Sequence, residues 1–416
     1  MSQQTKKNHI AFLPALALFA FACFIRYSRS YMSTYYTTLF ALSYDYGFIP
    51  QGFLGTFYKQ LSMHLPWEMQ NYIAVFNFSG LFTILYFLLL FLFYGVALHY
   101  CKEENRRNLQ HFIIFLSIFA FPMFMSSTNF GSVYLYFCII TLLSAILILW
   151  GKLEILIIPL GIIGMCIHED FFFLNGGLIL LLLLYKILFS EKNWQKFKCA
   201  FVLVAFLVST LYLLYYFENL SQYVGDSELI VEEIKTNAKL LSKSGLTYNP
   251  VIIKHDILGL DRTPLDAPYM NYNAQDFPIF CVLFAPYIFY ALRFFVRLIK
   301  STDTSRSKRI WYILAFFGGF LMLPLFINKT EFGVYIFNLC FYYIGILIFG
   351  LAVNESAMNA VFDGIKMELK QITPLHFVWL LYPFIITPFK GVTISTQIHD
   401  LAEIIFTELS FYLPMQ

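Results

Sequence analysis

Long apolar runs are the feature that most limits what this chain can fold into. A helix needs roughly 20 apolar residues to cross the hydrocarbon core of a bilayer, and the chain repeats runs of about that length. Hydrophobic residues fill 59% of its 416 positions and charged residues only 13%, against about 25% charged residues in soluble domains. The sequence therefore predicts an all-α, polytopic helical membrane protein with about eleven transmembrane helices. The predicted spans are 9–26, 71–98, 111–126, 132–150, 155–168, 171–189, 199–217, 277–297, 310–327, 333–353 and 374–390.

The positions of Lys and Arg predict the orientation of these spans. Cytoplasmic loops of membrane proteins hold an excess of basic residues. With the N-terminus inside, most of the 28 basic residues fall in internal connections, above all in 186–198 and 293–309. The consistent arrangement is N-in and C-out.

Two predicted external segments are longer than a connection needs. Residues 27–70 contain an aromatic and glycine-rich stretch, 44–56, and are predicted to form interfacial helices joined by turns. Residues 218–276 are predicted to form a cap over an external cavity, being too short for a stable domain of their own. Residues 1–416 thus form a single integral membrane domain with two long external loops.

Several function classes lack support. No basic run is interleaved with aromatic residues in a soluble segment, so nucleic acid is not an expected partner. The seven cysteines show no CxxC or Cys/His spacing. No P-loop, GxGxxG, HExxH or GxSxG motif appears in the sequence. The sequence therefore predicts a protein that has no cofactor and no metal site built from its own residues. Whether the protein uses a divalent metal is left open.

Three consecutive ionisable residues, His168, Glu169 and Asp170, occupy the predicted turn between two spans. Ionisable groups near membrane depth are costly and mark functional sites by default. A partly desolvated carboxylate here would suit general-base chemistry, with His168 orienting it or sharing its proton. The alternative is a solvated turn whose acidic residues cap the next helix.

Asp45 is a second candidate catalytic residue. It stands alone between Tyr44 and Tyr46, just before a turn that contains glycine and proline. Aromatic faces on both sides of a carboxylate suit the binding of a sugar ring and one of its hydroxyls. The alternative is an Asp that only stabilises the turn through backbone hydrogen bonds.

Basic residues on the external side are scarce, and each is a candidate ligand of a phosphate or diphosphate. The alternative is that they snorkel to lipid headgroups or pair with nearby carboxylates. These residues are Arg26, Arg29, Lys59, Arg262 and Lys329.

The stretch 45–55, Asp-Tyr-Gly-Phe-Ile-Pro-Gln-Gly-Phe-Leu-Gly, resembles a segment of many bacterial polysaccharide-locus membrane proteins. The layout of two long external loops is similar to that of GT-C-type glycosyltransferases and Wzy-type polysaccharide polymerases. Gln51, within this stretch, is a candidate substrate-binding residue. Related segments often carry Arg at this position, and this departure counts against a phosphate-clamp role for Gln51. The second acidic motif expected for GT-C enzymes is absent from 126–131, and the turn at 168–170 is its candidate replacement.

The resemblance implies a glycosyltransferase of the bacterial cytoplasmic membrane that polymerises O-antigen or capsule repeat units. Its expected partners are a polyprenyl-linked oligosaccharide, membrane lipids and other polysaccharide assembly proteins such as a chain-length regulator. The main alternative is a transporter or flippase in which the same residues line a translocation path. An O-acetyl-transferring enzyme and a non-catalytic assembly subunit are further alternatives.

Overall fold

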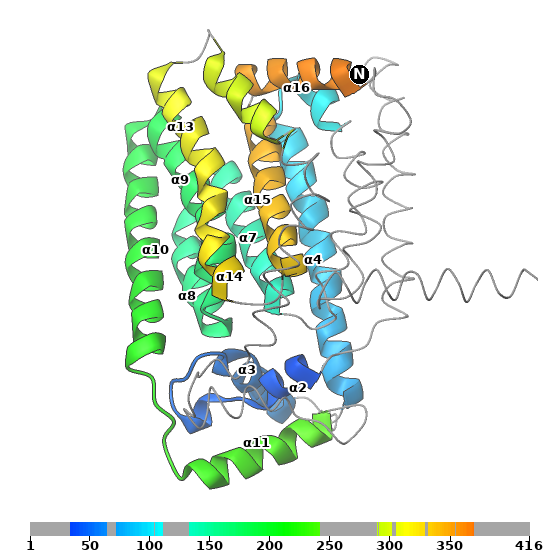
Figure 1. The fold of residues 1–416 in the computed structure, drawn as a ribbon, viewed down its shortest axis with the longest axis vertical. Coiled ribbons are helices and arrows are strands. Elements are labelled where there is room, and N and C mark those ends of the chain that lie inside the picture. The colour runs from blue at the N-terminus through cyan, green and yellow to red at the C-terminus, as the bar shows by residue number, and fades with distance from the viewer. Residues whose placement is uncertain are drawn as a thin grey trace, which may run out of the picture.

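The structure is a computed structural model that describes residues 34–64, 72–103, 105–110, 133–241, 289, 291–301, 305–328, 332–353 and 355–369. The described residues are helical or lie in turns, and none of them forms a strand. Most helices run side by side as a bundle, and a smaller group lies across one end of it (Figure 1). The chain is a helical membrane protein.

The bundle consists of α4 (Tyr72–Tyr100), α7 (Val133–Trp150), η2 (Glu154–Leu156) with α8 (Ile157–Ile167), η3 (Phe172–Gly176) with α9 (Gly177–Phe189), α10 (Asn193–Asn219), α13 (Arg306–Phe317) with η5 (Gly318–Met322) and α14 (Leu323–Asn328), and α15 (Phe332–Ala352). α7 packs between α4 and α8, and α10 packs on α8 and α9. α16 (Ser356–Leu369) crosses the end of the bundle beyond α15 (Figure 1).

Five described helices are long and apolar enough to cross a bilayer: Val75–Tyr100, Val133–Trp150, Phe172–Phe189, Asn193–Asn219 and Arg306–Leu325. The pair Asn338–Ala352 and Ser356–Gly364, bent by 117°, counts as a sixth if it is one span. The helix Glu154–Ile167 is apolar but shorter. Large apolar side chains of α4 and α10, such as Leu88 and Val208, point outward rather than into the bundle, as lipid-facing positions require.

The predicted spans within 71–98, 132–150, 155–168, 171–189, 199–217, 310–327 and 333–353 coincide with described helices to within a few residues. Predicted spans 9–26, 111–126 and 374–390 lie outside the described residues, as does most of 277–297. The total of eleven spans and the orientation therefore stay predictions.

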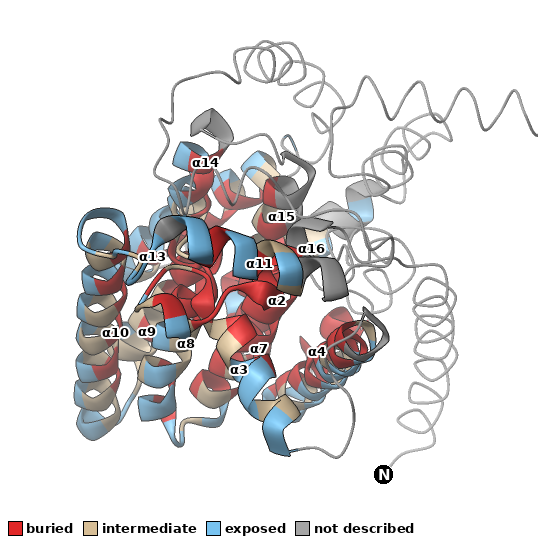
Figure 2. Ribbon diagram, turned by 90° about the horizontal axis from the view of Figure 1, so that it is seen from below, coloured by how far each residue is buried: buried red, intermediate tan, exposed pale blue. Residues whose placement is uncertain are grey.

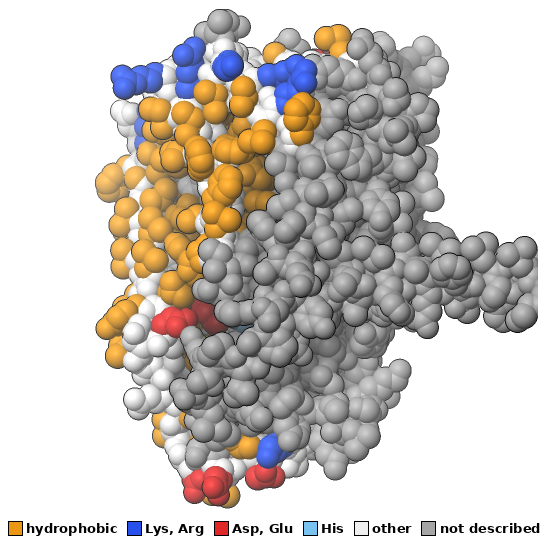
Figure 3. Space-filling model, viewed as in Figure 1, with side chains coloured by type: hydrophobic (Ala, Val, Ile, Leu, Met, Phe, Trp, Pro, Cys, Tyr) orange, Lys and Arg blue, Asp and Glu red, His pale blue; other side chains and the backbone are white. Residues whose placement is uncertain are grey.

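The two ends of the bundle differ in charge. In Figure 3, Lys and Arg side chains gather at the end where α10 and α13 begin, a broad apolar band follows, and acidic side chains lie below it. At the basic end, the buried Glu154 pairs with Lys198 at 2.6 Å and the buried Glu355 pairs with Lys308 at 2.6 Å. Glu154 of η2 is thereby tied to α10, and Glu355, in the link between α15 and α16, is tied to α13.

The opposite end is covered by a layer built from the two long loops. α2 (Thr34–Ala41), η1 (Tyr44–Tyr46) and α3 (Gly52–His64) come from the first, and α11 (Ser227–Leu241) comes from the second. Seen from below, α2, α3 and α11 lie across the ends of α7 and α8 (Figure 2). The two loops are joined by a backbone hydrogen bond from Val224 N–H to Tyr46 O, 2.8 Å long.

Within this layer, α3 packs so closely on the chain after α2 that only glycine fits at position 55. A Cβ on Gly55 would stand 1.7 Å from the carbonyl oxygen of Leu42 and 2.8 Å from that of Phe40. Both obstacles are backbone atoms, so rotation of a side chain cannot relieve the contact. Gly95 in α4, by contrast, has no atom within 4 Å of such a Cβ.

We expect Gly55→Ala to lower the thermal unfolding temperature of the purified protein, at a cost of about 1–3 kcal/mol for overpacking. Gly95→Ala is the matched control and should be neutral or stabilising by up to about 1 kcal/mol, since alanine favours the helix. Thermal unfolding in detergent measures both. Equal effects of the two substitutions would contradict the close packing of α3 on the chain after α2.

Candidate functional site

The turn at 168–170 sits between α8 and α9, at the end of the bundle that faces the loop layer. α8 ends where His168 adopts an extended backbone, with φ −169° and ψ 139°. The chain can reverse tightly here because the ring of Phe171 packs against Gly164, where a Cβ would meet it at 2.6 Å. The ring of His168 accepts a hydrogen bond at Nδ1 from Asp170 N–H, 3.2 Å long.

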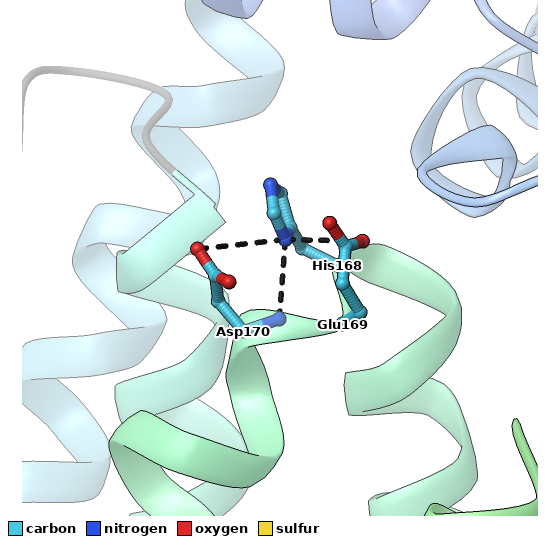
Figure 4. A group of neighbouring side chains, drawn as sticks. All are labelled: His168, Glu169 and Asp170. Atoms are coloured by element: carbon cyan, nitrogen blue, oxygen red, sulfur yellow. Dashed lines mark hydrogen bonds and ion pairs between the residues drawn. The ribbon is translucent and has the colours of Figure 1, made fainter. Parts of the chain in front are cut away.

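The three side chains of the turn converge on one edge of the imidazole. His168 Nδ1 lies 3.3 Å from Glu169 Oε2 and 3.8 Å from Asp170 Oδ2. The two carboxylates flank this nitrogen from opposite sides, and the other ring nitrogen points away from them (Figure 4). Only 5% of the His168 side chain and 4% of the Asp170 side chain are exposed. The Glu169 side chain is 20% exposed and can therefore be reached from outside the protein.

Gln51 connects the loop layer to this turn. Its Nε2 lies 3.2 Å from His168 Nε2, and its residue is 6% exposed. Its φ is +65°, a left-handed conformation that costs a residue with a side chain about 1–2 kcal/mol. No described residue gives a hydrogen bond to the buried Gln51 Oε1. A strained, buried and half-satisfied amide is typical of functional sites.

A π-helical turn, η3, follows Asp170 and places a second buried amide nearby in the chain. Asn175 is 1% exposed, and no hydrogen bond from the described residues reaches its side-chain amide. Single π turns inside α-helices are frequent at functional sites. Sequence analysis did not select Asn175, although a lone amide in an otherwise apolar run was a signal for it.

Asp45 lies on the surface of the loop layer. It pairs with Lys59 at 2.6 Å, and the two side chains are 55% and 53% exposed. It also accepts a hydrogen bond of 2.6 Å from Ser43. These hydrogen bonds, first from Lys59 and then from Ser43, hold the pKa of Asp45 below its ordinary value. Lys59, a candidate phosphate ligand, is thus engaged with a carboxylate, in an exposed pair that contributes little to stability.

Tyr44 and Tyr46 turn inward on either side of Asp45. The hydroxyl of Tyr44 lies against Cys166 of α8, and that of Tyr46 lies near Glu233 of α11. Burial, and next the Glu233 carboxylate, raise the pKa of Tyr46 well above its ordinary value. The two rings therefore dock the loop onto the bundle and onto α11, rather than forming a paired platform around Asp45.

The four remaining candidates for substrate binding, Arg26, Arg29, Arg262 and Lys329, lie outside the described residues. Among the described candidates, the structure brings together Gln51 with His168, Glu169 and Asp170. The roles assigned to all of these residues stay predictions.

Comparisons with known proteins assign this chain to no family. No family model matches the chain, and no curated protein or solved structure is significantly similar to it. The resemblance carried by residues 45–55 is thus untested.

If the left-handed Gln51 is kept for function, relieving it should not destabilise the fold. Gln51→Gly removes a backbone cost of about 1–2 kcal/mol and forfeits one hydrogen bond worth about 0.5–1.5 kcal/mol. We expect an unfolding temperature equal to or above that of the unmodified protein. A clear decrease would show that the Gln51 amide is a structural element of the fold.

Proposed function

We propose that this chain is a glycosyltransferase of the bacterial cytoplasmic membrane that acts on glycans carried by polyprenyl phosphate or diphosphate. The reaction most in keeping with the resemblance is polymerisation of polysaccharide repeat units at the external face. The observation that carries the proposal is the buried contact of Gln51 with the His168–Asp170 turn, which joins the first external loop to the ionisable cluster.

The charge distribution supports an external site. Basic side chains gather at the end where α10 and α13 begin (Figure 3). Because cytoplasmic loops hold an excess of Lys and Arg, this charge supports a cytoplasmic location for that end in the proposal. The turn at 168–170 and the loop layer lie toward the other end. This end would face the periplasm or the cell exterior, with the N-terminus inside and the C-terminus outside.

The position of the cluster also suits a lipid-linked substrate. The turn is placed where the apolar bundle meets the loop layer, so a bound polyprenyl chain can remain in the bilayer while its phosphate and sugars reach the cluster. Such donors carry their own activation, and no nucleotide-binding motif is needed.

In the proposed step, Glu169 accepts the proton of an acceptor sugar hydroxyl. The hydroxyl oxygen then forms a bond to the anomeric carbon of the donor, and the bond from that carbon to the phosphate oxygen breaks. The electron pair leaves on the polyprenyl phosphate or diphosphate, whose charge is the expected target of Arg26, Arg29, Arg262 or Lys329. Glu169 is favoured over Asp45 as the base because Asp45 is already held by Lys59 and Ser43.

We expect Glu169→Gln to reduce sugar transfer by at least about 100-fold, the lower range for loss of a general base. Asp45→Asn should reduce it less, and Glu232→Gln, an exposed change in α11, serves as the control. Each variant is expressed in a strain lacking the gene, and the length ladder of surface glycan is read on gels at matched protein levels. A normal ladder from Glu169→Gln would remove Glu169 from the proposed mechanism.

One feature favours the second candidate, a transporter or flippase of lipid-linked glycans. The π turn η3 and the 3-10 turn η5 interrupt two bundle helices and pack against each other, and broken helices often form transporter sites. Purified protein in liposomes separates the two functions. Movement of a labelled polyprenyl-linked glycan between leaflets without glycan elongation would favour transport.

A further inference from the structure

We propose that Gln51 is a positioning residue: its Oε1 accepts a hydrogen bond from His168 Nε2–H and holds the imidazole in a neutral form that leaves Glu169 free to act as a base. The state of His168 is inferred from the contacts of its two ring nitrogens. The consequence for catalysis at Glu169 rests on the proposed function.

The two ring nitrogens of His168 have different partners. Nδ1 lies 3.2 Å from the backbone nitrogen of Asp170, which donates its N–H to it (Figure 4). Nε2 lies 3.2 Å from the side-chain nitrogen of Gln51. A neutral imidazole has one nitrogen that accepts a hydrogen bond and one that carries a proton. Because Nδ1 accepts from Asp170, the proton of the neutral ring is on Nε2.

A proton on His168 Nε2 needs an acceptor, and the amide of Gln51 can supply one. With its nitrogen toward the ring, this amide would set an N–H group against His168 Nε2–H. Its oxygen is buried and receives no hydrogen bond from the described residues. Half a turn about the last side-chain bond exchanges the amide nitrogen and oxygen without changing the shape of the side chain. Gln51 Oε1 then accepts from His168 Nε2–H, in a contact that is buried on both sides.

Two other states of the His168 ring compete with this one. A neutral ring protonated on Nδ1 would let the Gln51 nitrogen donate to Nε2. A doubly protonated ring would be stabilised by the carboxylates of Glu169 and Asp170, at 3.3 Å and 3.8 Å from Nδ1. Both states place a proton on Nδ1, where it would point at the N–H of Asp170 and break that hydrogen bond. The N–H cannot easily turn away, since Asp170 already lies in the helical turn that leads into η3.

The state of the His168 ring decides what Glu169 can do. Glu169 Oε2 lies 3.3 Å from His168 Nδ1 and receives no hydrogen bond from the described residues. A doubly protonated ring would donate from Nδ1 to this oxygen, and such an ion pair favours the charged carboxylate and weakens it as a base. The neutral ring with its proton on Nε2 cannot form this pair. Glu169 then has no counter-charge within the turn and can take the proton of a sugar hydroxyl.

Nuclear magnetic resonance of the imidazole nitrogens tests the state of His168. The full-length protein, with ¹⁵N-labelled histidine, is placed in nanodiscs. The His168 signals are identified among those of the eight histidines by their loss in His168→Asn. At neutral pH we expect a neutral ring protonated on Nε2. A neutral ring protonated on Nδ1, or a doubly protonated ring, would overturn the proposal.

Gln51→Glu separates positioning from a purely structural role. This variant keeps the shape and an acceptor oxygen, but its negative charge beside Nε2–H favours a doubly protonated His168, which then pairs with Glu169. We expect the doubly protonated signal and sugar transfer slowed at least about tenfold, less than the complete loss of a general base. Gln60→Glu, on an exposed glutamine of α3, is the matched control and should change neither measurement.

Gln51→Leu, which buries no charge, is the second variant. Without an acceptor the proton of His168 is no longer held on Nε2, so the Nε2–H signal should weaken and sugar transfer should fall. Its matched control is Gln60→Leu. A His168 state that is the same in Gln51→Glu, in Gln51→Leu and in the unmodified protein would overturn the positioning role of Gln51.

Failure of the positioning role and failure of the proposed function give different results. Normal sugar transfer by Gln51→Glu, with His168 doubly protonated, would overturn the positioning role and leave the proposed function intact. The expected state of His168 in an unmodified protein that transfers no sugar would refute the proposed function and retain the hydrogen bond between His168 and Gln51.

Discussion

The contact between Gln51 and His168 joins two parts of the chain that are far apart in sequence and different in character. His168 belongs to a turn that ends an apolar helix, and Gln51 belongs to an aromatic loop that lies across the bundle. The contact lies where α3 packs on α8, and α11 packs on α2 of the same loop. Without the contact with Gln51, the turn at 168–170 would only connect two apolar helices.

Buried charged groups are stabilised differently at the two ends of the bundle. At the basic end, Glu154 and Glu355 are each paired with a lysine at 2.6 Å. These charges link separate segments of the bundle and are already engaged with each other. At the loop end, His168, Glu169 and Asp170 share one small space, and the nearby Gln51 amide is left half satisfied. The ionisable groups of this turn therefore contact one another and the first external loop, instead of tying separate bundle segments together.

Sequence reasoning predicted those features that depend on local pattern. The apolar run 132–150 became α7, Val133–Trp150, and the break between 168 and 171 became the turn of the candidate site, since an apolar run of helical length has few alternatives in a bilayer. The sequence alone did not predict contacts between segments that are far apart in the chain. Gln51 was selected as part of the segment that carries the resemblance, while its left-handed backbone and its contact with His168 depend on how the loop packs. The inward rotation of Tyr44 and Tyr46 likewise follows from tertiary packing, as does the π turn at Asn175.

The candidate site requires the first loop to lie directly over the turn at 168–170, and proximity cross-linking in the membrane tests this most directly. A Gln51→Cys, His168→Cys pair in a protein whose native cysteines are replaced should be joined rapidly by a short bifunctional thiol reagent. A Lys59→Cys, His168→Cys pair, with residue 59 on the outer surface of the loop layer, should react far more slowly. Absence of the first cross-link, or equal rates for the two pairs, would contradict the docking of the loop and with it the candidate site.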